Sequence, residues 1–288
     1  MNTKQRYRQA ITFGSPDKIP LYLGYPREST LAQWRKQGLP EGADFQDVLL
    51  DILGIEKDAI LKRNGVGISF RMIPEFETKV LEHKNGHMII RDWMGAVTEI
   101  SDRFDETYLR SAKDFVTRKW HKFPVETKDD WEEMKTRFNA GSEGRIPADF
   151  LKRCESWKNG EEILTLAFNG IFWQLREWCG FENLCIFMAE DPDFVHEMAG
   201  FWTEFVDKML GKILPHIELD CVFISEDMAY KAHSMISPAM TREFIQPAYK
   251  KWVPAIRNSG CPIIELDSDG CIDDLIPIWV ESGINCCS

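Results

Sequence analysis

The stretch from 163 to 179 reads ILTLAFNGIFWQLREWC, a short apolar run that continues directly into a helical pattern. Similar apolar runs lie further along the chain at 221–224, 262–266 and 284–287, and helical patterns follow the first two of these. Because the runs are mostly apolar throughout, they are typical of strands buried on both faces. Repeated strand–helix units of this kind predict an α/β protein with a parallel sheet and helices outside it, as an open sheet or as a barrel.

The amino-terminal part continues this pattern. Apolar runs at 19–24 and 65–70 read as two further strands, and a first helix is expected from about 3 to 13. Helical patterns also lie near 29–37 and 44–53. No GxGxxG follows any of the predicted strands, which disfavours a dinucleotide-binding sheet.

The pattern then changes to alternating residues around Asn85-Gly86. Asn-Gly is the strongest short signal for a β-hairpin, and a further strand is expected after Gly95. Asp92-Trp93 reads most simply as part of a turn. We therefore expect a single domain over 1–288 with an antiparallel ribbon inserted at 72–125.

Composition limits the classes of function. The chain has 35 Lys and Arg against 46 Asp and Glu, a formal charge of −11, so nucleic acid and anionic membranes are poor partners. No apolar run reaches the roughly 18 residues of a membrane span, and the start lacks the apolar core of a signal peptide. The eight cysteines form no CxxC pair and read as reduced, mostly buried thiols. These features predict a cytoplasmic protein with a small-molecule substrate.

Acidic residues gather where two predicted strands end, the place where parallel α/β folds carry their functional groups. Glu226 and Asp227 follow one apolar run, and Asp267 and Asp269 follow the next. If both acidic pairs face the same opening at the carboxyl ends of the strands, their repulsion could raise the pKa of one carboxyl enough for it to transfer a proton. We therefore assign these four residues as catalytic candidates. In the alternative interpretation, Asp269 starts a helix and Glu226 or Asp227 ties down a loop.

The same region defines a candidate site for a divalent metal. Asp267, Asp269 and His233 would be its ligands, since carboxylates and imidazole suit hard or borderline cations. The alternative for His233 is an ordinary surface residue in a solvated loop.

Further polar and aromatic residues follow other predicted strands and are substrate-binding candidates. The aromatic group that ends at Trp178 either floors an apolar pocket or forms the core of its own helix. The binding candidates are Asn169, Trp178, Arg71, Tyr25 and His233.

Four stretches resemble the uroporphyrinogen decarboxylase superfamily and occur in the order of that family. The first is RYRQAITFGSPDKIPLYLG (6–24), in which a helix leads through a PDR-P-like turn into a strand. The others are LAFNGIFWQLREWCGFENL (166–184), FISEDMAYKAHSMISPAMTREFIQPAYKKW (223–252) and DSDGCIDDLIPIWVESGIN (267–285). The resemblance implies a (β/α)8 TIM barrel with the active site at the carboxyl ends of its strands.

The superfamily contains decarboxylases and methyltransferases that take a methyl group from a corrinoid protein. GYPREST (24–30) stands where decarboxylases have an arginine motif, whereas LREWCGFENL (175–184) and RDWMGAV (91–97) look more like the methyltransferase branch. The resemblance therefore implies methyl transfer from a corrinoid on a partner protein to a small acceptor. Decarboxylation of a tetrapyrrole or other poly-acid, and a non-catalytic barrel that binds a corrinoid or a partner, are the alternatives.

Thiol-methylating members carry a zinc-binding His-x-Cys pair where this chain has Asp267-Ser268-Asp269. The replacement favours a nitrogen or oxygen acceptor, or another metal. In this scheme Asp267 and Asp269 orient the acceptor or a metal, Glu226 and Asp227 transfer a proton, and Asn169 and Trp178 line the pocket.

The resemblance accounts for about six barrel strands, with 284–287 as the last. A barrel that lacks two strands exposes two unpaired edges. We therefore expect either a fragment of a longer protein or a partner that covers the gap, and a homodimer is left open.

Overall fold

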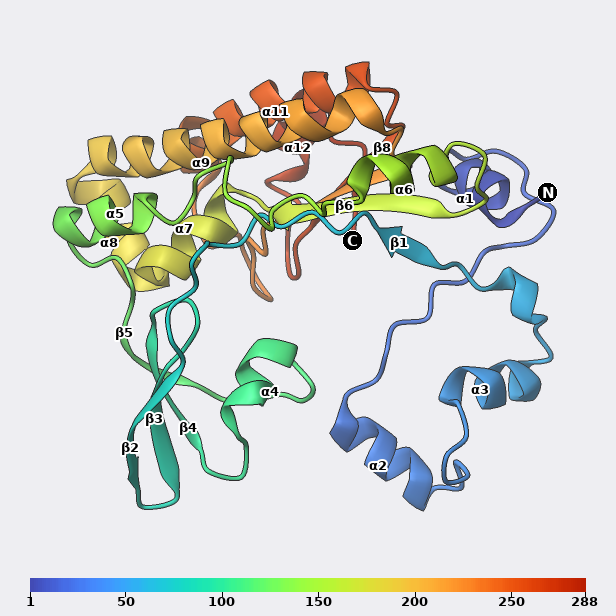
Figure 1. Cartoon of the computed structure of the whole chain (residues 1–288), viewed down its shortest axis with the longest axis horizontal. Coiled ribbons are helices and arrows are strands. Elements are labelled where there is room, and N and C mark those ends of the chain that lie inside the picture. Colours follow the sequence, from blue (N-terminus) through green and yellow to red (C-terminus); the bar gives the residue numbers. More distant parts are fainter.

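The computed structural model describes residues 1–288 and contains a five-stranded parallel sheet (Figure 1). Its strands lie in chain order, and β1 and β9 are its edges. They are β1 (Arg63–Gly65), β6 (Ile163–Asn169), β7 (Cys221–Ser225), β8 (Ile263–Asp267) and β9 (Cys286–Cys287). The predicted α/β class with a parallel sheet is confirmed, and the strands expected from residue 163 onward all lie in this sheet, parallel to their neighbours.

Helices pack over one face of this sheet, with α9 and α11 lying across it (Figure 1). Along β6, Leu164, Leu166 and Phe168 point into the core, while Ala167 and Asn169 face the other side. The helices on this face are α5 (Lys128–Lys135), α6 (Phe150–Trp157), α7 (Ile171–Cys179), α8 (Phe181–Glu190), α9 (Pro192–Ile213), α10 (Pro238–Met240), α11 (Gln246–Asn258) and α12 (Ile276–Glu281). Helix α1 (Thr3–Ile11) packs through Tyr7 on Ile163, whose side chain points to the other face of β6. None of these helices combines the length and the apolar character that crossing a bilayer requires.

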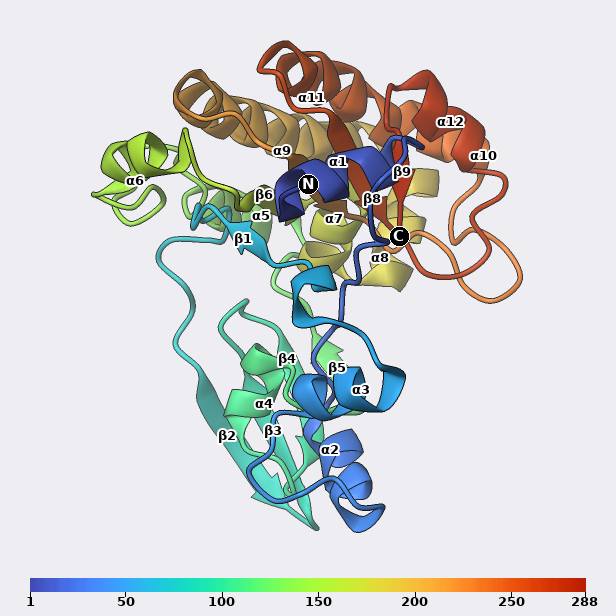
Figure 2. The ribbon, with the colours of Figure 1, turned by 90° about the vertical axis from the view of Figure 1, so that its right-hand side faces the viewer.

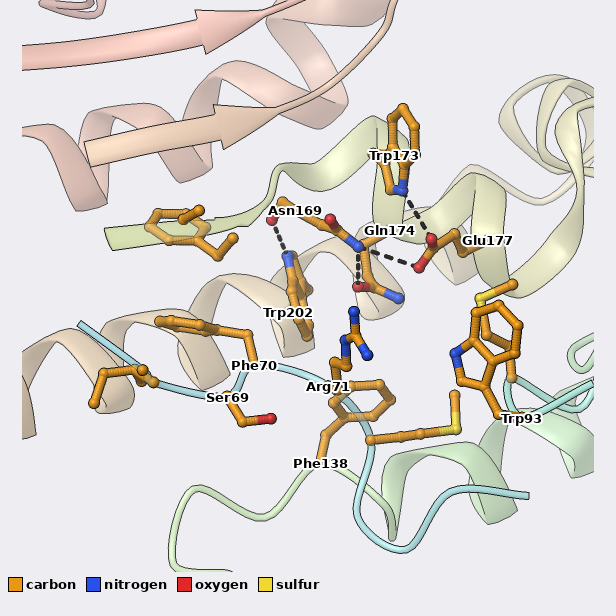
Figure 3. A pocket seen from close by; sticks show the side chains of 16 residues that line it. Ser69, Phe70, Arg71, Trp93, Phe138, Asn169, Trp173, Gln174, Glu177 and Trp202 are labelled. Carbon is orange, nitrogen blue, oxygen red and sulfur yellow. Dashed lines mark hydrogen bonds between the residues drawn. The ribbon is translucent and has the colours of Figure 1, made fainter. Parts of the chain in front are cut away.

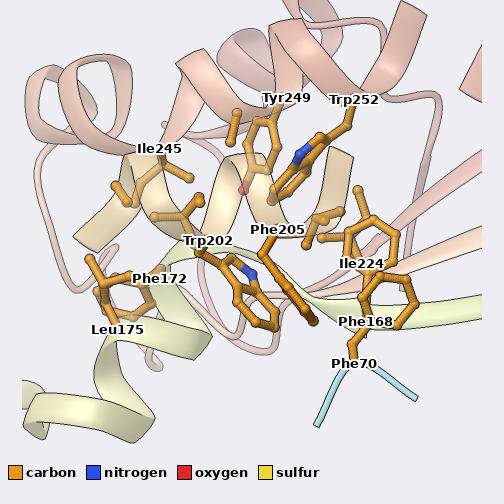
Figure 4. Close-up of a cluster of buried hydrophobic side chains, with 14 of the residues drawn as sticks. Phe70, Phe168, Phe172, Leu175, Trp202, Phe205, Ile224, Ile245, Tyr249 and Trp252 are labelled. Carbon is orange, nitrogen blue, oxygen red and sulfur yellow. The ribbon is translucent and has the colours of Figure 1, made fainter. Parts of the chain in front are cut away.

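Aromatic side chains of α9 and α11 fill the space between helices and sheet (Figure 4). The rings of Trp202 and Phe205 stack with centroids 5.1 Å apart, and Trp252 meets Phe168 edge to face at 5.4 Å. Helix α9 begins at Pro192, and the Asp191 side chain before it accepts the backbone N–H of Phe194. Its aromatic and methionine side chains pack in the core.

A second sheet of four antiparallel strands stands apart from the parallel one (Figure 2). Its first hairpin turns at Asn85 and Gly86, both with the positive φ that a two-residue type I′ turn requires. Ile90, Ile100 and Leu109 form its small core. The elements are β2 (Lys79–Lys84), β3 (His87–Arg91), β4 (Val97–Ser101), α4 (Glu106–Ser111) and β5 (Lys119–Lys122). The predicted antiparallel ribbon is confirmed and contains one strand more than the sequence indicated.

The two amino-terminal strands differ from the prediction. The run at 19–24 makes only an isolated parallel bridge, between Leu21 and Ile60, and Ile19 is 79% exposed because no strand covers it. The strand expected at 65–70 ends early, since Gly67 takes a φ of 79° that breaks the extended conformation.

The excursion between these two segments carries α2 (Glu28–Lys36), α3 (Phe45–Leu53) and a 3-10 turn (Lys57–Ala59), which lie away from the parallel sheet (Figure 1). The predicted helices near 29–37 and 44–53 are therefore present. A closed barrel is not seen, because β1 and β9 remain edges of the sheet.

Arg145 fastens the irregular segment after β1 to the rest of the molecule. The side chain is 1% exposed, and its guanidinium donates hydrogen bonds to the carbonyls of Ser69, Arg71, Arg137 and Asn139 at 2.6–3.3 Å. No carboxylate pairs with it, and burial lowers its pKa to about 10. Backbone carbonyls and the ring of Phe205, whose centroid lies 4.7 Å from the guanidinium carbon, therefore compensate this buried charge.

Replacing Arg145 by Met is expected to lower the free energy of unfolding by about 3 kcal/mol or more, because buried carbonyls lose charged donors. Urea unfolding measures the change. The matched control is Arg103→Met, since Arg103 is exposed and its side chain makes no hydrogen bond; it should stay within about 0.5 kcal/mol of the wild type. Equal stability of the two variants would contradict the role given to Arg145.

Candidate functional site

A cavity of about 590 Å³ opens at the carboxyl end of β6 (Figure 3). One wall is the irregular segment 67–72, held by Arg145, and another is the first two turns of α7. The antiparallel sheet supplies Trp93 and Met94, and α9 supplies Trp202. Parts of the chain far apart in sequence thus meet where parallel α/β folds place their sites.

Glu177 of α7 is the acid of this cavity. Its two carboxylate oxygens accept hydrogen bonds from Trp173 Nε1 at 2.8 Å and from Asn169 Nδ2 at 3.1 Å. Asn169 also donates to Gln174 Oε1 at 3.1 Å, which fixes the orientation of its amide. Burial raises the pKa of Glu177, and the donated hydrogen bond from Trp173 and the charge of Arg176 oppose the rise. A carboxyl with a raised pKa beside a cavity is suited to accepting a proton.

Arg71 is the cation of the cavity. Its guanidinium points toward Gln174 (Figure 3) and makes no ion pair or side-chain hydrogen bond. It acts on Glu177 through its charge, which lowers the pKa of that carboxyl. An arginine with free N–H donors at a cavity can hold an anionic group of a ligand.

The ribbon turn contributes an aromatic wall. The Asp92 carboxylate accepts the backbone N–H groups of Met94 and Ala96 at 3.0 and 3.1 Å, so the turn projects Trp93 toward the cavity. Gly95 has a φ of 92°, and a side chain there would meet the Phe76 ring at 2.7 Å. The interpretation of Asp92-Trp93 as turn residues holds, and the structure adds that Trp93 lines the cavity.

Glu226 lies at the amino end of α7 and is fully buried. Its carboxylate accepts the backbone N–H groups of Ile171 and Trp173 at 3.0 and 3.1 Å, and the Tyr249 hydroxyl of α11 donates to it. A side chain at Gly170 would overlap this carboxylate at 2.1 Å. Glu226 therefore caps α7 and does not line the cavity.

The other three acidic candidates lie together at the same edge of the sheet. Asp227 pairs with Arg176 at 3.3 Å. Burial raises the pKa of Asp267, and the nearby carboxylates of Asp269 and Asp227 raise it further. None of the three lines the cavity, and no group of His, Cys, Asp or Glu side chains in the chain is arranged to hold a metal ion. Their catalytic and ligand roles stay predictions.

Of the predicted binding residues, Arg71 and Asn169 line the cavity. Trp178 is 1% exposed and packs on Trp131 in the core, which agrees with the alternative that its aromatic group is core. Tyr25 is 85% exposed and His233 lies in an exposed loop, and neither reaches the cavity.

Sequence reasoning missed Glu177, Gln174 and Trp93 as cavity residues. Trp93 and Glu177 stand inside the quoted motifs RDWMGAV and LREWCGFENL, so those motifs contained the signal.

No family model matches the chain, and no curated protein matches it in sequence. Among solved structures, its fold is similar to that of a protein named methyltransferase from Methanosarcina mazei, with a TM-score of 0.51 and 13% identity. The match covers 100% of this chain and 76% of that chain. At such an identity the similarity concerns the fold alone, and function must be argued from the site.

A pH-dependent difference in stability is expected from Glu226, because burial raises its pKa to about 7. Unfolded glutamate titrates at about 4.3, so between these values the folded state holds the extra proton and stability falls as pH rises. Glu226→Gln cannot titrate. From pH 4.5 to 7.5, the unfolding free energy of the wild type should therefore fall by about 3 kcal/mol relative to the variant.

Urea unfolding at several pH values measures this difference. Glu182→Gln is the control, since Glu182 is exposed on α8 and should show no pH-dependent difference from the wild type. A constant difference between wild type and Glu226→Gln across the range would refute the expectation.

Proposed function

We propose that the protein transfers a methyl group to a small acceptor bound in the cavity of Figure 3. The observation that carries this proposal is the combination of one proton acceptor, Glu177, and one unpaired cation, Arg71, in a cavity with aromatic walls. The fold similarity to a methyltransferase is consistent with it.

The proposal includes membership in the uroporphyrinogen decarboxylase-like superfamily and a (β/α)8 barrel. All strand pairs of the main sheet are parallel and follow chain order, as in a barrel. The parallel bridge between Leu21 and Ile60 adds a segment before β1 that would become the preceding barrel strand. A cytoplasmic location also remains part of this proposal.

Methyl transfer to an acceptor X–H forms the X–CH3 bond and breaks the bond between methyl and donor. The electron pair of the broken bond stays with the donor, and one proton leaves the acceptor. Glu177 accepts that proton, Asn169 and Trp173 hold its carboxylate in place, and Arg71 binds an anionic group of the acceptor. A nitrogen or oxygen nucleophile suits this arrangement, because Asp267-Ser268-Asp269 stands where thiol-methylating members carry a zinc-binding His-x-Cys pair.

The proposed donor is a methylated corrinoid on a partner protein. A volume of about 590 Å³ lies in the range of small-ligand sites, about 300–1,000 Å³. The cavity therefore fits a small acceptor and leaves the corrinoid on its own protein. When bound, the corrinoid supplies an electrophilic methyl group.

Decarboxylation of a porphyrinogen has less support from the cavity. Arg71 is its only cation and faces the acid Glu177, so a substrate with several carboxylates would find no balancing charge. With uroporphyrinogen as substrate, chromatography should therefore show no enzyme-dependent coproporphyrinogen. Its formation would favour the decarboxylase.

Methylcobalamin with a panel of small amines and alcohols tests methyl transfer, followed by the absorbance change on demethylation. Glu177→Gln should lower the rate by about 100-fold or more, because general-base catalysis contributes that much. The wild-type rate should rise with pH as Glu177 ionises, whereas the rate of the variant should lose this dependence. Glu182→Gln, the same change at an exposed site of the next helix, should retain the wild-type rate.

Asp267→Asn tests the acid cluster in the same assay. If this variant lost activity and Glu177→Gln kept full activity, the proton acceptor would be one of the acids at the carboxyl end of β8 and not Glu177. Binding of methylcobalamin without demethylation by any acceptor would instead support the non-catalytic alternative.

A further inference from the structure

A second cavity lies beside the first, between the antiparallel sheet and helices α7 and α8. Its volume is about 490 Å³, which also lies in the small-ligand range of about 300–1,000 Å³. Trp93, Met94, Trp173 and Glu177 line both cavities and form a common wall. The methyl-transfer chemistry proposed for the first cavity makes no use of the second.

Aromatic rings form much of this second cavity, and two of them are partly open to solvent. Trp120 stacks on Phe123 with ring centroids 5.0 Å apart and planes inclined by 18°. Trp120 is 41% and Phe181 42% exposed. Gly180 admits the Phe123 ring, since a side chain there would meet it at 2.3 Å. Exposed rings around a cavity favour a planar apolar ligand that covers them.

Arg118 brings a cation without a salt-bridge partner to the same cavity. Its guanidinium lies 5.5 Å from the centroid of Trp120 and donates one hydrogen bond, to the carbonyl of Leu109 at 3.1 Å. It forms no ion pair, whereas the other arginine of the cavity, Arg176, is paired with Asp227 at 3.3 Å. Burial lowers the pKa of Arg118, and the charges of Asp92 and Glu177 oppose the decrease without forming a salt bridge to it. Its remaining N–H groups suit a carboxylate.

We infer that this second cavity binds a planar aromatic monocarboxylate, with its carboxylate on Arg118 and its ring against Trp120 and Phe181. A neutral ring would leave the free N–H groups of Arg118 without an ion-pair partner, and an aliphatic acid would leave the aromatic faces uncovered. A second negative charge would meet Glu177 on the common wall. The inference concerns binding alone, so it stands or fails independently of methyl transfer.

Isothermal titration calorimetry with 2-naphthoate, 2-naphthamide and cyclohexanecarboxylate tests the two required features of the ligand. The amide keeps the planar ring without the charge, and the cyclohexane acid keeps the charge without the planar ring. We expect 2-naphthoate to bind at least tenfold more tightly than either. Equal affinity of acid and amide, or no binding of 2-naphthoate at millimolar concentration, would overturn the inference.

Variants of residues that line the second cavity test whether 2-naphthoate binds there. Arg118→Met should weaken binding of 2-naphthoate at least tenfold and leave binding of 2-naphthamide unchanged, whereas Arg103→Met, in the turn after β4, should change neither. Trp120→Leu, a second variant at a partly exposed position, should weaken both naphthyl ligands, and circular dichroism confirms that each variant is folded.

Ala167→Phe separates the two cavities, because Ala167 lines only the first. Binding of 2-naphthoate that survives this substitution supports the second cavity. Binding that is lost in Ala167→Phe and retained in Arg118→Met would assign the acid to Arg71 in the first cavity and overturn the inference.

Discussion

The buried carboxylate of Glu226 is the constraint on which the candidate site depends. It joins the end of β7 to the first turn of α7 and to the Tyr249 hydroxyl of α11. Two unpaired N–H groups at the start of a helix need acceptors, and here a single side chain provides them from a neighbouring strand. The direction of α7 follows from this contact, and with it the positions of Trp173 and Glu177. The absence of a side chain at Gly170 is what allows the approach.

A second constraint acts on the opposite wall. Residues 67–72 have no strand partners, so their carbonyls need other donors, and Arg145 supplies them from a buried position. The loop is therefore irregular in conformation but well fastened. The Asp92 carboxylate stabilises the turn that carries Trp93 in a similar way. Two walls of the cavity, this turn and residues 67–72, therefore depend on individual polar contacts rather than on regular secondary structure.

These contacts explain what the sequence could and could not predict. The strands from residue 163 onward were predictable because apolar runs followed by helices are typical of buried parallel strands. The Asn85-Gly86 turn was predictable because these two residue types adopt the positive φ that the turn requires. The run at 19–24 has the same apolar character, yet tertiary contacts decide strand formation and it meets only Ile60. Asn169 and Arg71 could be predicted as binding residues because they follow predicted strands. Glu177 lies two turns into a helix, where a polar residue carries no special signal.

The two glutamates show why residue type and strand-end position do not identify a catalytic group by themselves. Glu226 has backbone and hydroxyl donors on its carboxylate and no exposed surface, so a substrate cannot contact it in this structure. Glu177 is also held by two donors, but its carboxylate borders a cavity that a ligand can enter. Both acids have a raised pKa for the same reason, burial. What distinguishes the two carboxylates is access for a ligand, and the access to Glu177 depends on Glu226, which holds α7 so that Trp173, Gln174 and Glu177 face the cavity.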